Sequence, residues 1–356
     1  MFESFGFEET TAKEVSVLFA LGIGILFGLL AERIQFCFRR AVVGDDRRAA
    51  AGVWLMALAV AVIGTQFAVS AELISFDDHR FMAAELPVLA IIAGGALFGA
   101  GMVLTRGCVS RLTVLSGSGN LRALLVLVVF AIVAHAMLKG VLAPLRVAVG
   151  SVTLDLGTTT SLATLPGGAW IWSGLIAAAA LGVALRSGNR PVTLLMAVLI
   201  GALVPLAWVG TGFILLDEFD PIAMESLSFT SPAADSLFYT IAASSIPAGF
   251  GAGLMGGVLL GALLSSLVFG SFQWQSFESP RQTGRYLTGA TLMGVGGVLA
   301  GGCTVGAGLS GVPTLSFAAL LALVSIAGGA LATQAVIQGA SGSAGSPATP
   351  SPQPAE

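Results

Sequence analysis

Charged side chains are scarce in this sequence. Asp, Glu, Lys and Arg make up 10% of the 356 residues, hydrophobic residues make up 56%, and the mean hydropathy is +0.93. Soluble globular domains carry about 25% charged residues, so the composition excludes that class. We expect a polytopic membrane protein that resides in a lipid bilayer and binds no nucleic acid.

Cysteine pairs and enzyme motifs are also lacking. The three cysteines form no CxxC, which argues against both a disulfide framework and a zinc site. No stretch resembles a P-loop, a catalytic triad or a metal cage. We therefore expect a protein that is not an enzyme and that uses no metal or cofactor. Of the two histidines, we expect His135 to be a hydrogen-bonded core residue and His79 a loop residue.

Long apolar stretches dominate what is present. A helix needs about 20 mostly apolar residues to cross a bilayer, and nine stretches qualify. They lie near residues 14–31, 49–70, 84–104, 121–143, 168–186, 191–213, 246–270, 284–301 and 314–338. The acidic N-terminus, MFESFGFEETTAKE, lacks the basic region and cleavage site of a signal peptide, so we expect the first stretch to be a retained span.

These spans predict an all-α fold with one transmembrane domain over residues 14–338. The N-terminus (1–13) is expected outside the cytoplasm. The last stretch (339–356) is rich in Ser, Ala, Gly and Pro, which predicts a disordered tail in the cytoplasm.

The distribution of positive charge predicts this orientation. Twelve of the sixteen Lys and Arg residues fall in loops on one side of the predicted spans, and the loop at 217–235 on the other side has five acids and no base. Because cytoplasmic loops are enriched in Lys and Arg, we expect the acidic loop to be solvated on the outer face.

A repeated element contains every cysteine in the chain. Residues 292–303 (LMGVGGVLAGGC) match residues 97–108 (LFGAGMVLTRGC) at seven of twelve positions, and residues 26–37 (LFGLLAERIQFC) form a fainter copy. In each copy the cysteine (Cys37, Cys108 or Cys303) follows a glycine by nine residues.

The last two copies end the third and eighth predicted spans, so five crossings separate them. An odd offset inserts the two copies in opposite directions. We therefore predict an inverted repeat, with halves at about 14–143 and 191–338 and a connector span at 168–186.

A short polar, glycine-containing piece follows each cysteine. Such a piece is tolerated at membrane depth only where protein surrounds it or it lines a cavity, so we expect re-entrant helices that bring the three thiols together. Backbone N–H groups at such tips bind anions. Further candidate anion contacts are Arg106, Arg111, Gly302, Thr304 and Asn120.

Plainer interpretations exist for the same residues. A buried cysteine is often only a small apolar side chain, and glycines in membrane helices usually serve close packing. Arg106 and Arg111 bracket Cys108, and this position is equally compatible with anion attraction and with setting topology. The repeated spacing of three cysteines favours a functional role for the thiols.

The cysteine blocks carry a family resemblance. The blocks IQFCFRRA, TRGCVSRLTVLSGSGNLRALLVLVVFA and SPRQTGRYLTGATLMGVGGVLAGGCTVGAGLSG are similar to those of the YeeE/YedE family of bacterial membrane proteins, whose characterised member takes up thiosulfate. The resemblance implies nine transmembrane helices plus short re-entrant helices in an hourglass shape, located in the bacterial inner membrane. It also implies that Cys37, Cys108 and Cys303 pass thiosulfate inward by S–H to sulfur contacts, beside a small cytoplasmic sulfur-carrier protein.

Three alternatives stay open from the sequence. The substrate of the transporter is either thiosulfate or another sulfur or selenium compound such as sulfite. A membrane thiol–disulfide oxidoreductase is disfavoured because the chain lacks CxxC. A membrane anchor or assembly subunit would need neither the matched cysteines nor the re-entrant segments.

Overall fold

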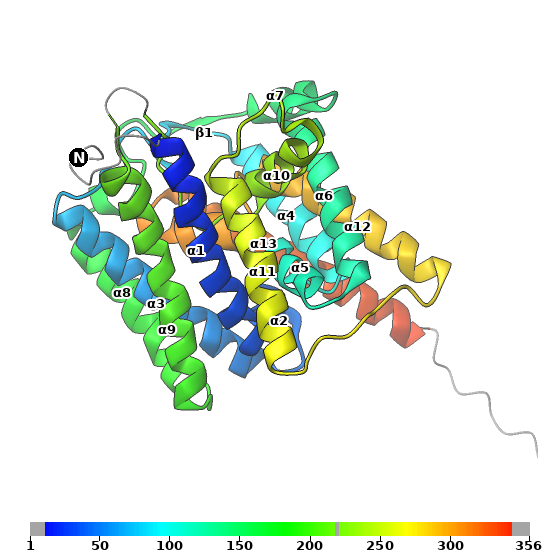
Figure 1. Cartoon of the computed structure of the whole chain (residues 1–356). Helices are drawn as coiled ribbons and strands as arrows, with labels where there is room; N and C mark the ends of the chain where they lie inside the picture. Colours follow the sequence, from blue (N-terminus) through cyan, green and yellow to red (C-terminus); the bar gives the residue numbers. More distant parts are fainter. Residues whose placement is uncertain (1–10, 218–220, 344–356) are drawn as a thin grey trace, which may run out of the picture.

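A computed structural model describes residues 11–217 and 221–343 of the chain. Within these ranges, nine helical segments are long and apolar enough to cross a membrane, and the β-structure consists of one two-residue pair with two isolated bridges. The predicted fold class, an all-α polytopic membrane protein, is therefore confirmed. Figure 1 shows the long helices side by side, with the N-terminal end of α1 and β1 at one end of the bundle.

The nine long helices lie close to the predicted spans. They are α1 (Ala12–Arg33), α3 (Arg47–Ser70), α4 (Val88–Leu104), α6 (Leu121–Lys139), α8 (Gly168–Leu185), α9 (Pro191–Val209), α11 (Phe250–Val268), α12 (Pro280–Leu299) and α13 (Phe317–Ser343). The largest difference is at the C-terminal end, where α13 continues to Ser343. The tail boundary at 339 is thus five residues too early, and the remaining tail (344–356) lies outside the described residues, as do positions 1–10 of the N-terminus.

Local sequence signals set two helix starts. Thr11 and Glu14 form a capping box at the start of α1, each side chain bonding to the backbone N–H of the other. Ser279 accepts from the Gln282 N–H at the start of α12, and Pro280 occupies the first turn, where its missing N–H has no helical partner to lose. These signals move the start of α12 four residues ahead of the predicted position.

Shorter elements connect the spans. Three of them follow the cysteines: α2 (Phe38–Val43), α5 (Val109–Gly117) and the π-helical η5 (Thr304–Gly311). The others are η2 (Arg80–Met82), β1 (Glu85–Leu86), α7 (Ala143–Gly150), β2 (Leu154–Asp155), η3 (Leu162–Thr164), η4 (Gly210–Ile214), α10 (Thr230–Ala242) and η6 (Val312–Thr314). Strands β1 and β2 pair antiparallel.

Helix α10 corrects one prediction. Residues 230–235 of the acidic loop begin a helix that packs against α6 and α11, and Pro232, Ala233 and Ala234 are buried there. The expected solvated loop at 217–235 therefore ends six residues early, at residue 229. Asp235 keeps an exposed side chain, in line with the prediction.

Glycines bring α1 and α11 into backbone contact. Gly24 and Gly28 of α1 face α11, and Gly253, Gly257 and Gly261 of α11 face α1. A Cβ atom at any of these five positions would overlap a backbone carbonyl of the other helix. Small residues spaced by four allow such close packing in membranes, where no hydrophobic force drives helices together. The two helices run side by side in Figure 1.

The main helix pairs follow a regular pattern. The most extensive contacts are those of α1 with α11, α4 with α13, α4 with α12, α3 with α9, α3 with α8 and α12 with α6. Exchanging each span for the one five crossings away turns α1–α11 into α9–α3 and α4–α13 into α12–α6, and leaves α4–α12 unchanged. The connector α8 packs on α3 alone among these pairs. An inverted repeat generates this pattern.

Candidate functional site

The three cysteines occupy the same local structure. Each is the N-cap residue of a short helix, in extended conformation: Cys37 before α2, Cys108 before α5 and Cys303 before η5. Two residues ahead of each, the backbone is left-handed, with φ of 52° at Gln35, 60° at Arg106 and 75° at Gly301. The sequence repeat therefore encodes one backbone motif used three times.

Backbone hydrogen bonds at the preceding helix ends fix this motif. The Phe36 N–H donates to the Ala31 carbonyl at 3.0 Å, and the Gly107 N–H donates to the Met102 carbonyl at 3.1 Å. This six-residue closure, with a left-handed residue inside it, is the Schellman ending of a helix. It turns the chain back into the protein, so that a cysteine follows at the start of a new helix.

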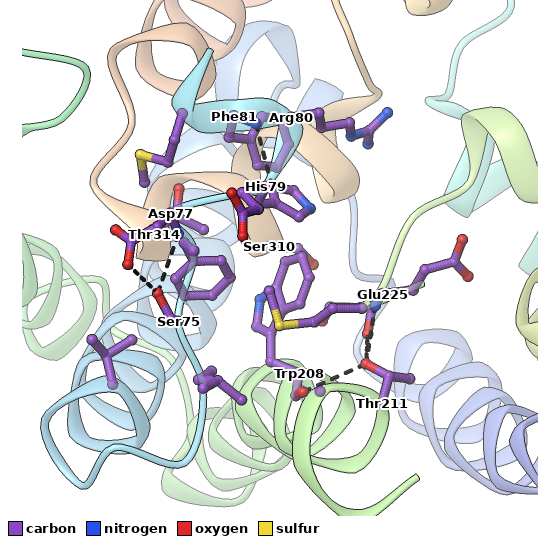
Figure 2. Close-up of a pocket in the computed structure, with 18 of the residues that line it drawn as sticks. Ser75, Asp77, His79, Arg80, Phe81, Trp208, Thr211, Glu225, Ser310 and Thr314 are labelled. Atoms are coloured by element: carbon purple, nitrogen blue, oxygen red, sulfur yellow. Dashed lines mark hydrogen bonds between the residues drawn. The ribbon is translucent and has the colours of Figure 1, made fainter. Parts of the chain in front are cut away.

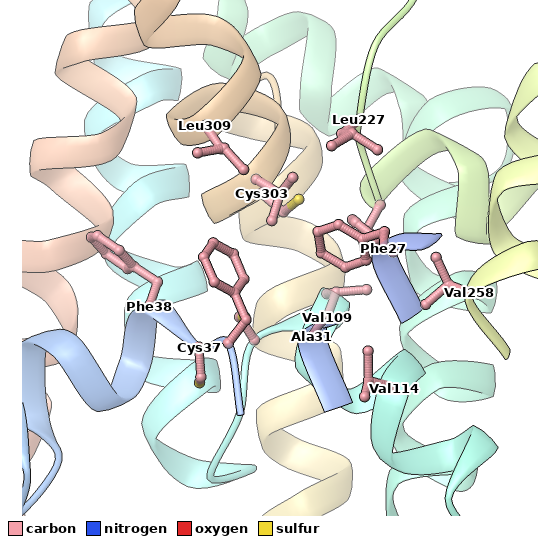
Figure 3. Close-up of a cluster of buried hydrophobic side chains, with 14 of the residues drawn as sticks. Phe27, Ala31, Cys37, Phe38, Val109, Val114, Leu227, Val258, Cys303 and Leu309 are labelled. Carbon is pink, nitrogen blue, oxygen red and sulfur yellow. The ribbon is translucent and has the colours of Figure 1, made fainter. Parts of the chain in front are cut away.

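The motif gathers the thiols inside the protein. Cys37, Cys108 and Cys303 are 4%, 1% and 0% exposed, and all three are free thiols. The Cys37 and Cys108 side chains interact with each other, and Cys108 lies within electrostatic range of Cys303. Figure 3 shows Cys303 entering the cluster from one side and Cys37 lying on the other. Residues 71 to 266 positions apart in the chain are thus brought to one place.

Hydroxyl groups accompany the thiols. The Cys108 sulfur lies 3.3 Å from the Ser110 hydroxyl oxygen. The Thr304 hydroxyl lies beside Cys108, yet it is buried and has no hydrogen-bond partner of standard geometry among the described residues. The predicted contact Thr304 is therefore placed between the segments of Cys108 and Cys303.

Aromatic rings surround the thiols. The Phe27 ring lies 6.1 Å from the Phe36 ring and 5.4 Å from the Phe229 ring, measured between centroids, and all three side chains are buried. These rings belong to α1, to the turn before Cys37 and to the segment before α10. The surroundings of the thiols are consequently apolar except at sulfur, hydroxyl and backbone N–H groups.

A cavity of ≈ 1460 Å³ lies on the β1 side of the Cys303 segment; we call it the vestibule. Its walls come from the loop before η2, from residues 221–228 and from α9, and Gly306, Ser310 and Thr314 of the η5–η6 segment line it too. Figure 2 shows Ser310 and Thr314 facing this space opposite Trp208 and Thr211. The vestibule therefore reaches the segment that carries Cys303.

Ionisable side chains line the vestibule. His79 packs against the rings of Phe76, Phe81 and Trp208 at centroid distances of 5.9, 4.9 and 5.2 Å. This burial, helped by the nearby Arg80 charge, lowers the pKa of His79 to about 4. Its Nδ1 accepts from the Phe81 N–H at 3.3 Å, so the ring is held neutral.

Arg80 lines the vestibule together with four carboxylates, those of Glu72, Asp77, Asp78 and Glu225. The side chains of Arg80 and Glu225 are exposed to this cavity, and Figure 2 shows them reaching toward the same side of it. Glu225 is accessible from the cavity, but the surrounding protein partly shields its carboxyl group from bulk water and so raises its pKa, while the Arg80 charge opposes that rise. Arg80 is also within electrostatic range of Cys303. Sequence reasoning missed this vestibule; its one visible signal was Arg80, one of the four Lys and Arg residues on the predicted outer side.

The predicted anion contacts divide into two groups. Arg111 lies beside Cys37 and Cys108, and Gly302 and Thr304 flank Cys303. By contrast, Arg106 is exposed, and the Asn120 side chain caps α6 and donates to Gln275 at 2.8 Å. The structure brings the first group to the thiols and gives the other two residues different surroundings.

Within the described residues, the chain is a polytopic membrane protein with nine candidate spans and three buried thiols, each at the start of a short helix. It belongs to the sulphur transport family, whose model matches residues 34–332. The resemblance to the YeeE/YedE family is confirmed by this match. Two similar proteins are both named thiosulfate transporter TsuA. The one from Escherichia coli K12 is 24% identical over 82% of this chain and 86% of its own length. The one from Spirochaeta thermophila is 27% identical over 85% of this chain and 93% of its own length.

Proposed function

We propose that this protein takes up thiosulfate through a central path in which Cys37, Cys108 and Cys303 pass the ion from thiol to thiol. The observation that carries the proposal is the gathering of all three cysteines, from three copies of one motif, into one buried cluster. The names of the two similar proteins supply the substrate.

The chemistry of the substrate suits such a path. Thiosulfate has a soft terminal sulfur and a hard sulfonate end, so weak S–H donors hold one end while backbone N–H groups, hydroxyls or an arginine hold the other. Burying an unpaired charge costs several kcal/mol or more. Successive weak contacts offset this cost, and none of them holds the ion too tightly for it to leave.

We further propose an orientation in the bacterial inner membrane. With the N-terminus outside and the C-terminus in the cytoplasm, the arginine-rich loops face inward, as the positive-inside bias requires. The vestibule then opens to the outside and Cys303 is the first thiol that the ion meets. Cys108 and Cys37 follow, and a small sulfur-carrier protein receives the ion in the cytoplasm.

Uptake of labelled thiosulfate by cells that lack other uptake routes tests the relay. We expect each of the variants Cys37→Ala, Cys108→Ala and Cys303→Ala to lose most of the uptake while reaching the membrane at normal abundance. Near-normal uptake in all three variants would contradict the thiol relay. Growth on thiosulfate as sole sulfur source gives an independent readout.

A second candidate substrate is another sulfur or selenium anion such as sulfite. The hydroxyl and N–H groups beside the thiols favour it, because they recognise oxygen atoms that all these anions share. Competition of sulfite, sulfate and selenite against labelled thiosulfate separates the candidates: sulfane-sulfur recognition predicts that sulfate does not compete. An oxidoreductase would instead show a redox-cycling cysteine pair on alkylation and mass measurement, where a relay shows three free thiols.

A further inference from the structure

The Cys303 sulfur lies where two helix N-termini converge. Helix η5 begins at Thr304, and the N–H of Gly306 in its first turn donates to the sulfur at 3.4 Å. The N–H of Val305 in the same turn also points to it. Helix α10 begins at Thr230, and the N–H of its N-cap residue, Phe229, points to the same sulfur.

The two N-termini are held together by direct contacts. The Ser310 hydroxyl donates to the Leu227 carbonyl at 2.7 Å, joining η5 to the segment that enters α10. Gly306 packs so closely on Ser228 that a Cβ atom at Gly306 would come 2.7 Å from the Ser228 hydroxyl. The N–H groups of both helices are therefore fixed in place and do not need to reorganise around a ligand.

These donors are poorly matched by a thiol. Sulfur is a weak acceptor, and the N-terminus of a helix carries a partial positive charge that favours an anion. Two hydroxyls in the same first turns, those of Thr304 and Thr230, are 1% and 3% exposed and make no hydrogen bond of standard geometry among the described residues. Buried donors without partners are rare in folded proteins, and the Thr304 hydroxyl lies beside the Cys108 sulfur, one residue along the chain from Cys303.

We propose that the N–H groups of Phe229, Val305 and Gly306, with the Thr304 hydroxyl, form an oxyanion-binding nest that the Cys303 sulfur fills at rest. The oxygens of an arriving anion replace the sulfur when the thiol turns aside, so Cys303 closes the path until an anion displaces it. This proposal rests on the proposed function only for the side from which the anion reaches Cys303. The nest itself is defined by hydrogen-bond donors of the protein.

Sulfate is the appropriate probe, because it offers oxyanion oxygens and no sulfane sulfur. We would measure its binding by calorimetry to the purified full-length protein. In Cys303→Ala the sulfur no longer occupies the nest, so the N–H groups can donate to sulfate. Because hydrogen bonds to a charged ligand are strong, we expect roughly tenfold tighter sulfate binding than in the wild type. Adding Thr304→Val, which removes a donor and keeps the shape, reverses part of this gain.

Cys108→Ala is the matched control, since it removes a neighbouring buried thiol and leaves the nest filled. No gain in sulfate affinity for Cys303→Ala, or an equal gain for Cys108→Ala, overturns the nest. If Cys303→Ala does not fold, the alkylation rate of Cys303 in a Cys37→Ala/Cys108→Ala protein decides instead. Sulfate should roughly double that rate or more by displacing the thiol; an unchanged or lower rate overturns the proposal.

The nest and the proposed function fail in different ways. A wild-type protein that takes up no thiosulfate, combined with tighter sulfate binding by Cys303→Ala, removes the substrate assignment and keeps the nest. Normal thiosulfate uptake by the wild type without any gain in sulfate binding removes the nest and keeps the transport proposal.

Discussion

Arg111 donates from Nη1 to the carbonyl oxygen of Ala31 at 3.4 Å, and this contact joins α5 to the end of α1. The contact holds a partly buried guanidinium beside the thiols of Cys37 and Cys108. Arg106, on the other side of Cys108 in the sequence, points into solvent. Arg106 and Arg111 flank Cys108 symmetrically in the sequence, but only Arg111 lies beside the thiols in the structure.

The first prediction follows from that difference. Arg111→Gln removes a charge next to the inner thiols, and loss of a hydrogen bond to a charged group, worth about 1.5–3 kcal/mol, predicts a fall of roughly tenfold or more in thiosulfate uptake. Arg106→Gln is the matched control and should stay within about twofold of the wild type, since surface substitutions have small effects. Equal losses in the two variants would show that charge in the loop, and not position beside the thiols, matters.

The second prediction concerns the close packing of α1 and α11. A Cβ atom at Gly257 overlaps the Leu21 carbonyl of α1, whereas at the adjacent Gly256 the nearest atom, Cδ1 of Leu21, is 3.9 Å away. Gly257→Ala should therefore destabilise the protein by about 1–3 kcal/mol, the usual cost of overpacking. Gly256→Ala should be neutral or slightly stabilising. Thermal unfolding of the two purified variants measures the difference, and similar unfolding temperatures would contradict the contact.

The third prediction is a pH effect at His79. Its pKa is lowered to about 4 in the folded protein, against about 6.5 in an unfolded chain. Between these values the unfolded chain binds more protons, so the stability contributed by neutral His79 is present above pH 6.5 and is lost as the pH falls toward 4. At pH 5 the loss should be on the order of 1–2 kcal/mol.

Comparison with His79→Asn isolates this effect. The Asn amide oxygen retains an acceptor for the Phe81 N–H but does not titrate. The raised pKa of Glu225 contributes with opposite sign in the same range, and it is common to both proteins. The unfolding temperature of the wild type should drop more steeply than that of His79→Asn from pH 7 to pH 5; parallel curves would refute the assignment.

The fourth prediction concerns capture of the anion in the vestibule. Arg80→Gln should raise the KM for thiosulfate and weaken its dependence on ionic strength, because a positive charge in a cleft concentrates anions. Glu225→Gln should lower the KM, since it removes the one of the four lining carboxylates that acts on Arg80 most directly. The maximal rate should change little in both. If the KM changed in the same direction in both variants, the substitutions would be acting by disturbing the fold and not through the electrostatic potential of the vestibule.

Much of this architecture is visible in the sequence. The nine spans follow from apolar length alone, and the repeated spacing of the three cysteines indicates a shared motif. Helix α10 was missed because it is short and begins inside the acidic stretch; burial of Pro232 and its neighbours against α11 stabilises it. Likewise, the Phe229 N–H meets Cys303 across 74 positions of the chain, and no local pattern signals that encounter.

The glycine contacts between α1 and α11 limit how the protein can move. The chief partner of α1 is in the second half of the chain, and the same holds for α3, apart from the connector α8, and for α4 and α6. Rocking one half against the other would shear backbones that touch without intervening side chains, at Gly24 and Gly257 among other places. These backbone contacts tie the two halves together and oppose any rigid-body rocking between them.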